Sequence, residues 1–448
     1  MRQIKDDQLV LQFYQSQSKQ SKKFKIIEDF LKKDRNILEE VKKDFCSRKG
    51  KFCGAKGMTV EQVVRVGILK QITQKSYLKL YDELNDNLCY RNFTKIYDGK
   101  VPKANTLCEN IKRIKPQSWE KINRFIIGIA KESGIEKGSK VRIDTTGVES
   151  NIHHPTDGEL LWDCIRVINR IIGTAKEEYP GLEFKYSNHG LYAKRRRYKI
   201  TNTSRKEHRR KAYAELLKIS AVVKGYGKAC VEALSKKEFA GEIEAQIYRE
   251  ELAKYILALE KIQKQAHRRV IEEEKVPAGE KLVSIFEEHT DILTKGKRKV
   301  IFGHKIMLSG GKSNLVLDCK IERGNWSDSE NFATGLDRLE NIYGTMPKEV
   351  STDGGFASKN NYEYATGAGI EKVVFTKGAT AKIKELIRSS SAYKRLKKFR
   401  AGIEGCISAC KRAYGLDRCT WKGWESFQSY VWVSIIAFNL NVIAEKLL

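Results

Sequence analysis

The pattern of apolar and polar positions changes along the chain, from helical spacing to strand-like alternation and back. In residues 16–47 apolar side chains recur every three or four positions, which predicts an amphipathic helix or a pair of helices. Thr59, with Gln62 three residues later, predicts a capping box at the start of another helix, and a further helix start is predicted near Thr106. We therefore expect an all-helical domain over residues 1–135. Its short helices fit a DNA-binding helix-turn-helix, and they equally fit any small helical bundle.

Strand-like alternation first appears at residues 139–146, SKVRIDTT, and we expect this strand to end at Asp144. A long charged block with helical periodicity follows. Five of its apolar residues have the spacing of a helical hairpin or a short coiled coil: Leu252, Ile256, Leu259, Ile262 and Ala266. Internal helix packing and a dimer seam both explain this spacing.

Strands resume after the charged block and then alternate with helices. The predicted elements are strands at 298–309 and 313–324 joined by Gly310–Gly311, a helix at 332–344, a short strand ending at Asp353, a helix at 361–368, a strand at 370–376, a basic helix at 382–415 and an apolar helix at 424–447. Without the helical block, this order gives a three-stranded meander followed by βα units. It predicts an α/β domain with a mixed sheet.

Three parts of the chain are therefore expected. They are an all-helical N-terminal domain at 1–135, an α/β domain at 136–158 and 295–448, and a helical insertion with a basic segment at 159–294. The insertion follows the first strand of the sheet.

The net charge of the chain indicates which kind of molecule the protein binds. The chain has 448 residues with 85 Lys and Arg against 56 Asp and Glu, a formal net charge of +29. Such an excess predicts salt-dependent binding to a polyanion and disfavours a generic metabolic enzyme. The ten cysteines include no CxxC pair, which favours free thiols in a reducing cytoplasm. We see no signal peptide, and the most apolar stretch, residues 430–438, is too short to span a membrane.

Three acidic residues are the candidates for catalysis. Asp144 and Asp353 each follow an apolar strand and precede small residues, which suits the binding of a hard cation. On a helix, Glu404 shares one stripe with Arg400 and Lys411, so a carboxylate lies between two cations. Singly, each acid is more often a turn residue, a cap or half of a surface ion pair.

The same residues carry a resemblance. RIDTTGVESNIHHPTD, VSTDGGFAS and FRAGIEGCISACK resemble the three catalytic blocks of DDE transposases from bacterial insertion sequences. RGNWSDSENF resembles the Gly-Asn-x-x-Asp segment that many of these enzymes carry. Arg400-x3-Glu404-x6-Lys411 matches part of the helix signature of one large branch. That branch has Tyr where this chain has Lys397, and its insertion lies before the Glu helix, so a divergent group is expected.

The resemblance implies a ribonuclease-H-like fold and a function. Asp144, Asp353 and Glu404 would bind two Mg²⁺ ions, which Mn²⁺ can replace, and catalyse DNA cleavage at transposon ends followed by 3′-OH strand transfer. Two metals suit this chemistry because one can activate the attacking oxygen while the other stabilises the leaving oxygen. The alternative is a domesticated or inactive relative that acts as a simple nuclease or a DNA-binding protein.

Basic segments predict where DNA binds. Residues 194–211 contain ten Lys and Arg with only Glu207 opposing, which fits phosphate-backbone contact or a solvated loop. The candidate DNA-binding residues are Lys194, Arg195, Arg196, Arg197, Lys397, Lys398, Arg400 and Lys411, together with Trp326, which could stack on a base or pack in the core. The expected partner is double-stranded DNA, bound by a homodimer in the cytoplasm at the nucleoid, with no membrane involved.

Overall fold

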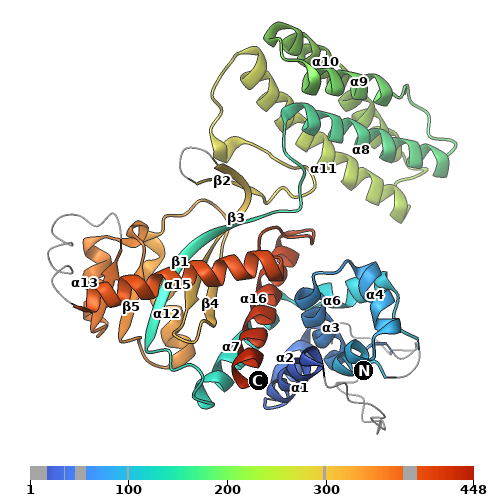
Figure 1. Ribbon diagram of the computed structural model, residues 1–448. Coiled ribbons are helices and arrows are strands. Elements are labelled where there is room, and N and C mark those ends of the chain that lie inside the picture. Colours follow the sequence, from blue (N-terminus) through green and yellow to red (C-terminus); the bar gives the residue numbers. More distant parts are fainter. Residues whose placement is uncertain (1–17, 35, 46–56, 98–99, 296–298, 377–390) are drawn as a thin grey trace. The chain divides into compact units, whose positions relative to one another are not determined.

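The computed structural model describes residues 18–34, 36–45, 57–97, 100–295, 299–376 and 391–448 (Figure 1). The chain divides into two compact units. One contains residues 1–151 and 293–448, and the other contains residues 152–292. Each unit has a hydrophobic core of its own, so each is described separately.

A mixed sheet forms the centre of the first unit, as the sequence predicts. Its strands are β1 (Lys140–Glu149), β2 (Asp291–Lys295), β3 (Lys299–Gly310), β4 (Val316–Ile321), β5 (Glu349–Thr352) and β6 (Lys372–Phe375). The order is β2-β3-β1-β5-β6, with β4 also paired to β3. Strand β3 runs antiparallel to β1 and β4, whereas β5 is parallel to both β1 and β6.

The expected end of the first strand at Asp144 is wrong. Strand β1 continues to Glu149 because it pairs with β3 as far as Glu149 opposite Gly303. Its parallel ladder with β5, however, ends at Ile143 opposite Thr352. Asp144 therefore lies inside β1, one residue beyond the last parallel pair. Asp353 likewise comes one residue after that pair, where β5 ends.

Seven helices are described before the sheet: α1 (Lys19–Leu31), α2 (Asn36–Phe45), α3 (Val60–Thr73), α4 (Tyr77–Asp86), α5 (Leu88–Thr94), α6 (Ala104–Lys112) and α7 (Pro116–Glu132). The capping box of Thr59 and Gln62 is present at the start of α3. The helix predicted to start near Thr106 is α6, which begins two residues earlier at Ala104, and its N-cap residue, Lys103, makes no side-chain cap.

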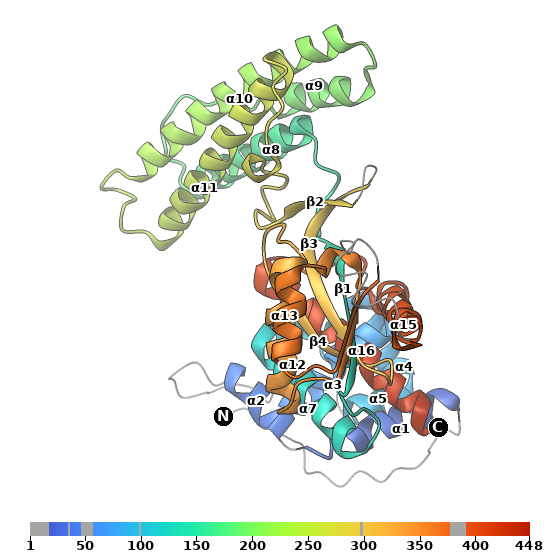
Figure 2. The ribbon, with the colours of Figure 1, turned by 90° about the vertical axis from the view of Figure 1, so that its left-hand side faces the viewer.

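The remaining helices of this unit are α12 (Phe332–Tyr343), α13 (Lys359–Gly367), α15 (Ser391–Tyr414) and α16 (Trp424–Leu447). Figure 2 shows α12 and α13 on one side of the sheet and α15 on the other. The predicted beginning of the basic helix at residue 382 lies outside the described residues. Helix α16 packs against α1, α3, α7 and α15 and reaches β4.

Helix α16 joins the N-terminal helices and the sheet into one core. By length and composition it is the one described helix that could cross a membrane, but 83% of its most apolar window is buried. Such burial is expected of a helix at the centre of a core. The eight described cysteines are free.

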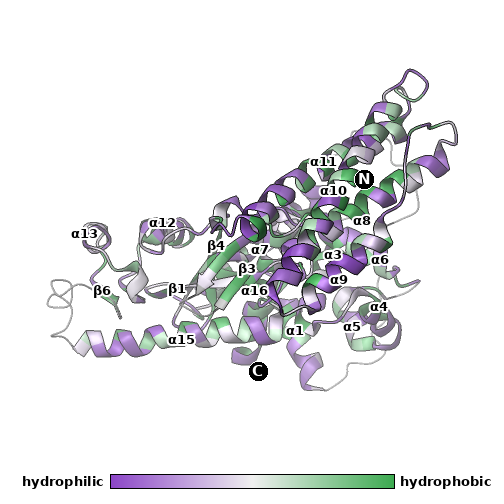
Figure 3. Cartoon of the chain, turned by 90° about the horizontal axis from the view of Figure 1, so that it is seen from above, coloured by the Kyte–Doolittle hydropathy of each residue, from purple (hydrophilic) through white to green (hydrophobic). Residues whose placement is uncertain are grey.

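The second unit is a bundle of α8 (Asp157–Glu178), α9 (Gly190–Asn202), α10 (Lys206–Leu234) and α11 (Ile243–Ala266), followed by a π-helical turn at His267–Ile271. The five apolar residues with heptad-like spacing in α11 are all buried in the core of this unit. Their spacing therefore reflects packing within the chain. Figure 3 shows that α9, by contrast, is mostly hydrophilic.

Candidate active site

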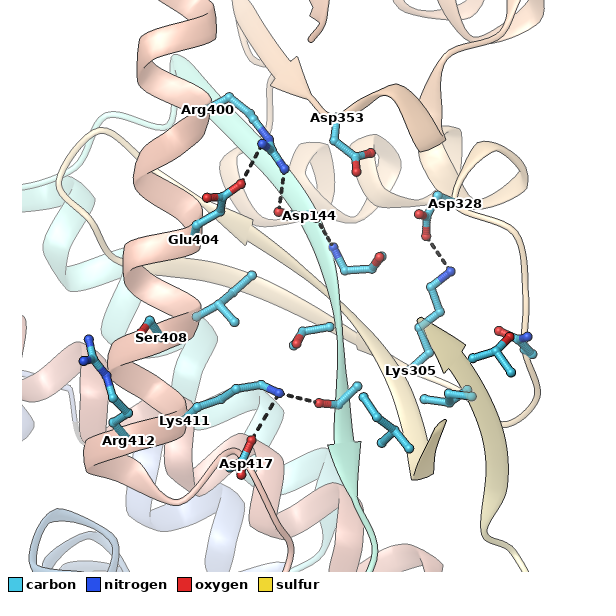
Figure 4. Close-up of a pocket in the computed structure, with 18 residues that line it drawn as sticks. Asp144, Lys305, Asp328, Asp353, Arg400, Glu404, Ser408, Lys411, Arg412 and Asp417 are labelled. Atoms are coloured by element: carbon cyan, nitrogen blue, oxygen red, sulfur yellow. Dashed lines mark hydrogen bonds and ion pairs between the residues drawn. The ribbon is translucent and has the colours of Figure 1, made fainter. Parts of the chain in front are cut away.

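One cavity of about 850 Å³ lies in the first unit and is lined mainly by polar residues. It brings together Asp144 on β1, Asp353 after β5 and Glu404 on α15. Figure 4 shows the three carboxylates around this cavity, each from a different element. The residues that sequence reasoning selected for catalysis are thus neighbours, although 209 positions separate the two aspartates in the numbering.

Asp144 is the most enclosed of the three. Its side chain is 12% exposed, and its Oδ1 accepts a hydrogen bond of 2.8 Å from the Thr145 amide. Burial raises the pKa of this carboxyl to about 6, and the nearby charges of Asp353 and Glu404 add to the rise. A ligand that requires the ionised carboxylate must therefore displace a proton at moderately acidic pH.

Asp353 is held by the turn that follows β5. It is the N-cap of a short 3-10 helix, and its Oδ1 accepts a hydrogen bond of 2.9 Å from the Gly355 amide. A side chain at Gly355 would collide with Asp328, because a Cβ there would lie 2.8 Å from Asp328 Oδ2. Glycine therefore lets two acidic side chains approach the same turn.

Helix α15 is attached to the sheet by buried polar contacts. Arg142 of β1 donates to Phe399 O at 2.9 Å, and Ser351 of β5 donates to Leu396 O at 3.0 Å. These contacts fix the helix across the strands that carry the two aspartates. Glu404 follows little more than one turn after Phe399, and its side chain remains 60% exposed.

Arg400 links two of the candidate carboxylates. Its Nη2 lies 3.0 Å from Asp144 Oδ2, and its Nη1 lies 2.7 Å from Glu404 Oε1 (Figure 4). The guanidinium therefore supplies positive charge between two acids that would otherwise repel each other. It was predicted to contact DNA, and in this arrangement it pairs with protein carboxylates.

The donor set fits a hard divalent cation in its chemistry. The acidic residues lining the cavity offer oxygen ligands, and no Cys or His is among the lining residues. Within the described residues, however, no three such side chains lie close enough together to hold a metal ion. Arg400 occupies one oxygen of Asp144 and one of Glu404, so a cation bound there would compete with it or share these carboxylates.

Besides Arg412, sequence reasoning missed three further charged residues of the cavity. Lys305 of β3 pairs with Asp328 at 2.6 Å and donates to Trp326 O at 3.0 Å. Asp328 was noted only as the last residue of the Gly-Asn-x-x-Asp segment. Lys411 donates to Gly147 O at 2.8 Å and lies 3.4 Å from the third missed residue, Asp417. The pairing of β1 with β3 places Lys305 opposite Gly147, whose carbonyl oxygen accepts the hydrogen bond from Lys411. Knowledge of this strand register would have indicated that Lys305 belongs to the cavity.

The other predicted DNA contacts are distributed differently. Trp326 is partly buried against the core, with the Lys305 ammonium 4.7 Å from its ring centroid. Lys397 and Lys398 are exposed on α15. On α9, Lys194 and Arg195 are exposed.

Two neighbouring arginines on α9 have partners within the second unit. Arg196 pairs with Glu215 at 2.5 Å, and Arg197 pairs with Glu159 at 2.7 Å. These pairs tie α9 to α10 and α8, so both arginines contribute to the packing of the bundle.

Comparison with known protein families decides what kind of domain holds this cavity. Residues 289–440 match the family model of the transposase DDE domain. This segment is therefore similar to a transposase DDE domain. The match includes Asp353 and Glu404, whereas Asp144 and helices α8 to α11 precede it. No curated protein and no solved structure matches the chain. The DDE domain indicates an enzyme of DNA transposition.

Proposed function

We propose that this protein is a transposase that cleaves DNA at transposon ends and transfers the freed 3′-OH into target DNA. The observation that carries the proposal is the meeting of Asp144, Asp353 and Glu404 at one cavity, most of whose lining residues belong to the segment that matches the DDE domain. The ribonuclease-H-like fold is part of the same proposal. The strand order supports it, with an antiparallel meander on one side of β1 and parallel strands on the other.

The three carboxylates would hold two Mg²⁺ ions, or Mn²⁺ in their place. When bound, such ions activate an oxygen nucleophile and stabilise the leaving oxygen of a phosphodiester. Asp144 is suited to serve both ions, because its strand, β1, pairs with β5 and also contacts α15. The protein supplies no covalent nucleophile in this scheme; water attacks first, and the 3′-OH of the cleaved end attacks the target.

Arg400 and Lys411 would contact the DNA phosphates beside the carboxylates. If Asp144 and Glu404 held a cation, Arg400 would lose these partners, and its guanidinium would be able to bind a phosphate with two parallel hydrogen bonds. The exposed ammonium groups of Lys397 and Lys398 extend the basic surface along α15.

The remaining candidate contacts have distinct roles in the proposal. Lys194 and Arg195 are exposed and would touch the DNA backbone. The packing of Trp326 under Lys305 favours a role in holding the loop of Asp328 over base stacking. Because transposition joins two DNA ends, we expect a homodimer on DNA, and we expect it to act in the bacterial cytoplasm at the nucleoid. A divergent insertion-sequence group remains part of the proposal.

Metal-dependent cleavage tests this function. The substrate is a DNA fragment carrying the sequence that flanks the gene, incubated with Mg²⁺ or Mn²⁺. Asp144→Asn, Asp353→Asn and Glu404→Gln should each reduce cleavage at the flank by at least about a hundredfold, since each removes an oxygen ligand. DNA binding, measured by fluorescence anisotropy, should survive in all three.

Asp417→Asn is the matched control. Asp417 lines the same cavity but pairs with Lys411, and its side chain is 67% exposed. We expect the control to keep most of the cleavage. Cleavage without joining would indicate a domesticated nuclease. Tight DNA binding without cleavage by the wild type would indicate an inactive relative, and cleavage that survives Glu404→Gln would contradict the proposed site.

A further inference from the structure

The helical insertion contains a second cavity with basic walls. It has a volume of about 500 Å³ and lies where the end of α9, the start of α10 and the π-helical turn meet. Four cationic side chains line it: Lys206, Arg209, Arg210 and Arg269. Two acids, Asp157 and Glu273, and the hydroxyl groups of Thr156, Thr201 and Tyr213 complete the polar wall. We call it the insertion pocket.

A buried carboxylate orients one of the four cations. Asp157 is 4% exposed, and its Oδ2 lies 2.7 Å from Arg269 Nη1. Its Oδ1 accepts a hydrogen bond of 2.7 Å from Gln265. The guanidinium of Arg269 is thereby fixed by one nitrogen, while its side chain remains 39% exposed. Five N–H groups on one guanidinium leave donors for a ligand in the pocket.

The other cations differ in how far they are already paired. Lys206 forms an ion pair of 2.7 Å with Glu273, and both side chains are largely exposed. Arg210 donates to Ile271 O at 2.7 Å. Arg209 is exposed and forms no ion pair within the described part of the chain. With four cations and two acids among its lining residues, the pocket has a formal charge of +2, which favours the binding of an anion.

The backbone beside the pocket is irregular. Residues 267–271 form a π-helical turn, and Glu273 has φ of 59°, a left-handed conformation that costs a non-glycine residue roughly 1 kcal/mol. π-Helical turns and such conformers are concentrated at functional sites. Both Arg269, within the turn, and Glu273, just after it, line the pocket.

The charge distribution indicates what the pocket binds. Residues 152–292 contain 27 Lys and Arg against 22 Asp and Glu, yet residues 194–211 alone contain ten against one. The positive charge of the insertion is therefore concentrated at the α9–α10 corner, and the rest of the insertion is net negative. Ile200 and Thr201 of α9 line the pocket. The exposed basic face of α9, with Lys194, Arg195 and Lys199, thus leads to it.

We propose that the insertion pocket binds a phosphodiester group of the DNA backbone, with Arg209 and Arg269 as its principal ligands. This inference rests on the proposed function, since it takes DNA to be the substrate. It adds a DNA contact in a part of the chain outside the segment matched by the DDE family. Arginine suits the role because its planar fork binds two oxygens of one phosphate.

Salt-dependent DNA binding by the full-length chain tests the pocket. All proteins carry Glu404→Gln, so that the DNA is not consumed, and the probe is a fluorescein-labelled duplex of arbitrary sequence. Each lost phosphate contact lowers the slope of log K against log salt by about 0.9. We expect this decrease for Arg209→Ala and for Arg269→Ala, whereas Arg209→Lys should keep most of the slope.

The control is Lys237→Ala. Lys237 is also exposed and cationic, but it follows the far end of α10, about 40 Å from Arg209 at 1.5 Å per residue. It should leave the slope unchanged. Thermal melting of every variant checks that it is folded. Arg269→Ala removes the ion pair with buried Asp157, so the conclusion depends chiefly on Arg209→Ala, which leaves that ion pair in place.

Each outcome separates the two proposals. An unchanged slope in folded Arg209→Ala, or an equal decrease in the control, would overturn the pocket and leave the transposase proposal intact. Failure of the parent protein to bind the duplex would instead overturn the transposase proposal. A third outcome combines two results: inorganic phosphate protects Arg209 from modification by phenylglyoxal, and the slope of log K against log salt is the same in all variants. This outcome would assign the pocket to a small phosphate ligand and overturn the DNA contact.

Discussion

At the residue scale, Glu28 shows how a single ionisable group stabilises the packing of the N-terminal helices. It lies on α1 and is paired with Lys32 at 2.7 Å and with Lys95, the residue that caps α5. Burial raises the pKa of Glu28, but the hydrogen bonds from both lysines lower it by more. The pKa of Glu28 therefore lies below the ordinary value. The ionised form is therefore favoured by folding.

This pKa predicts a stability that depends on pH. A lowered carboxyl pKa contributes stability above the ordinary value of 4.5, and the contribution is lost as the pH falls through the lower folded value. At neutral pH, Glu28→Gln should reduce the free energy of unfolding by about 2 kcal/mol, and the difference from wild type should shrink below pH 4.5. Urea unfolding at several pH values measures it.

The control for Glu28 is another acid on the same helix. Asp29 pairs with Lys25, but both side chains are more than half exposed. Asp29→Asn should change the stability by less than about 0.5 kcal/mol at any of these pH values. A constant deficit of Glu28→Gln from neutral to acidic pH would contradict the assignment of the effect to ionisation.

At the element scale, the placement of α15 depends on how closely its backbone approaches Arg142. A Cβ added at Gly402 would lie 1.9 Å from Arg142 Nη1, and the Arg142 side chain is fixed by Phe399 O and Asn314. Gly402→Ala must therefore push the helix away from β1 or break these bonds. Glu404, two residues along, would move with it.

Two substitutions on α15 test this dependence. Gly402→Ala should lower cleavage at least about tenfold and reduce stability by about 1–3 kcal/mol, because a packed region has to shift. Gly405→Ala is the matched control, since a Cβ there meets nothing within 4 Å. It should stabilise the helix by about 1 kcal/mol and keep cleavage. Equal activity of the two variants would show that Gly402 does not set the position of Glu404.

The same scale shows what the sequence could predict. Element types and their order follow from local periodicity, so the mixed sheet, the capping box at Thr59 and the helix at 424–447 were predictable. The extent of β1 was not, because it is determined by pairing with β3, more than 150 residues later in the chain. The pairing of Arg400 with Asp144 likewise depends on tertiary packing, so its helix stripe alone suggested only a phosphate contact.

At the scale of the whole molecule, the two units share no core residue among the residues that the structure describes. Leu440 of α16 is fully buried in the core of the first unit, and Leu252 of α11 is fully buried in that of the second. The chain crosses between the units twice, after residue 151 and before residue 293. Separate cores predict that the two units lose stability independently.

Leu252→Ala and Leu440→Ala form a matched pair for this prediction. Each removes the same atoms from a fully buried site and should cost its own unit about 2–5 kcal/mol. Hydrogen exchange measured by mass spectrometry should show faster exchange in α8, α10 and α11 for Leu252→Ala, and in α7, α16 and the sheet for Leu440→Ala. Mn²⁺ binding to the DDE domain should be retained in the first variant and weakened in the second. Faster exchange throughout the chain in both variants would instead mean that the two units unfold as one cooperative body. A substitution in the insertion pocket would then also affect the site of Asp144, Asp353 and Glu404.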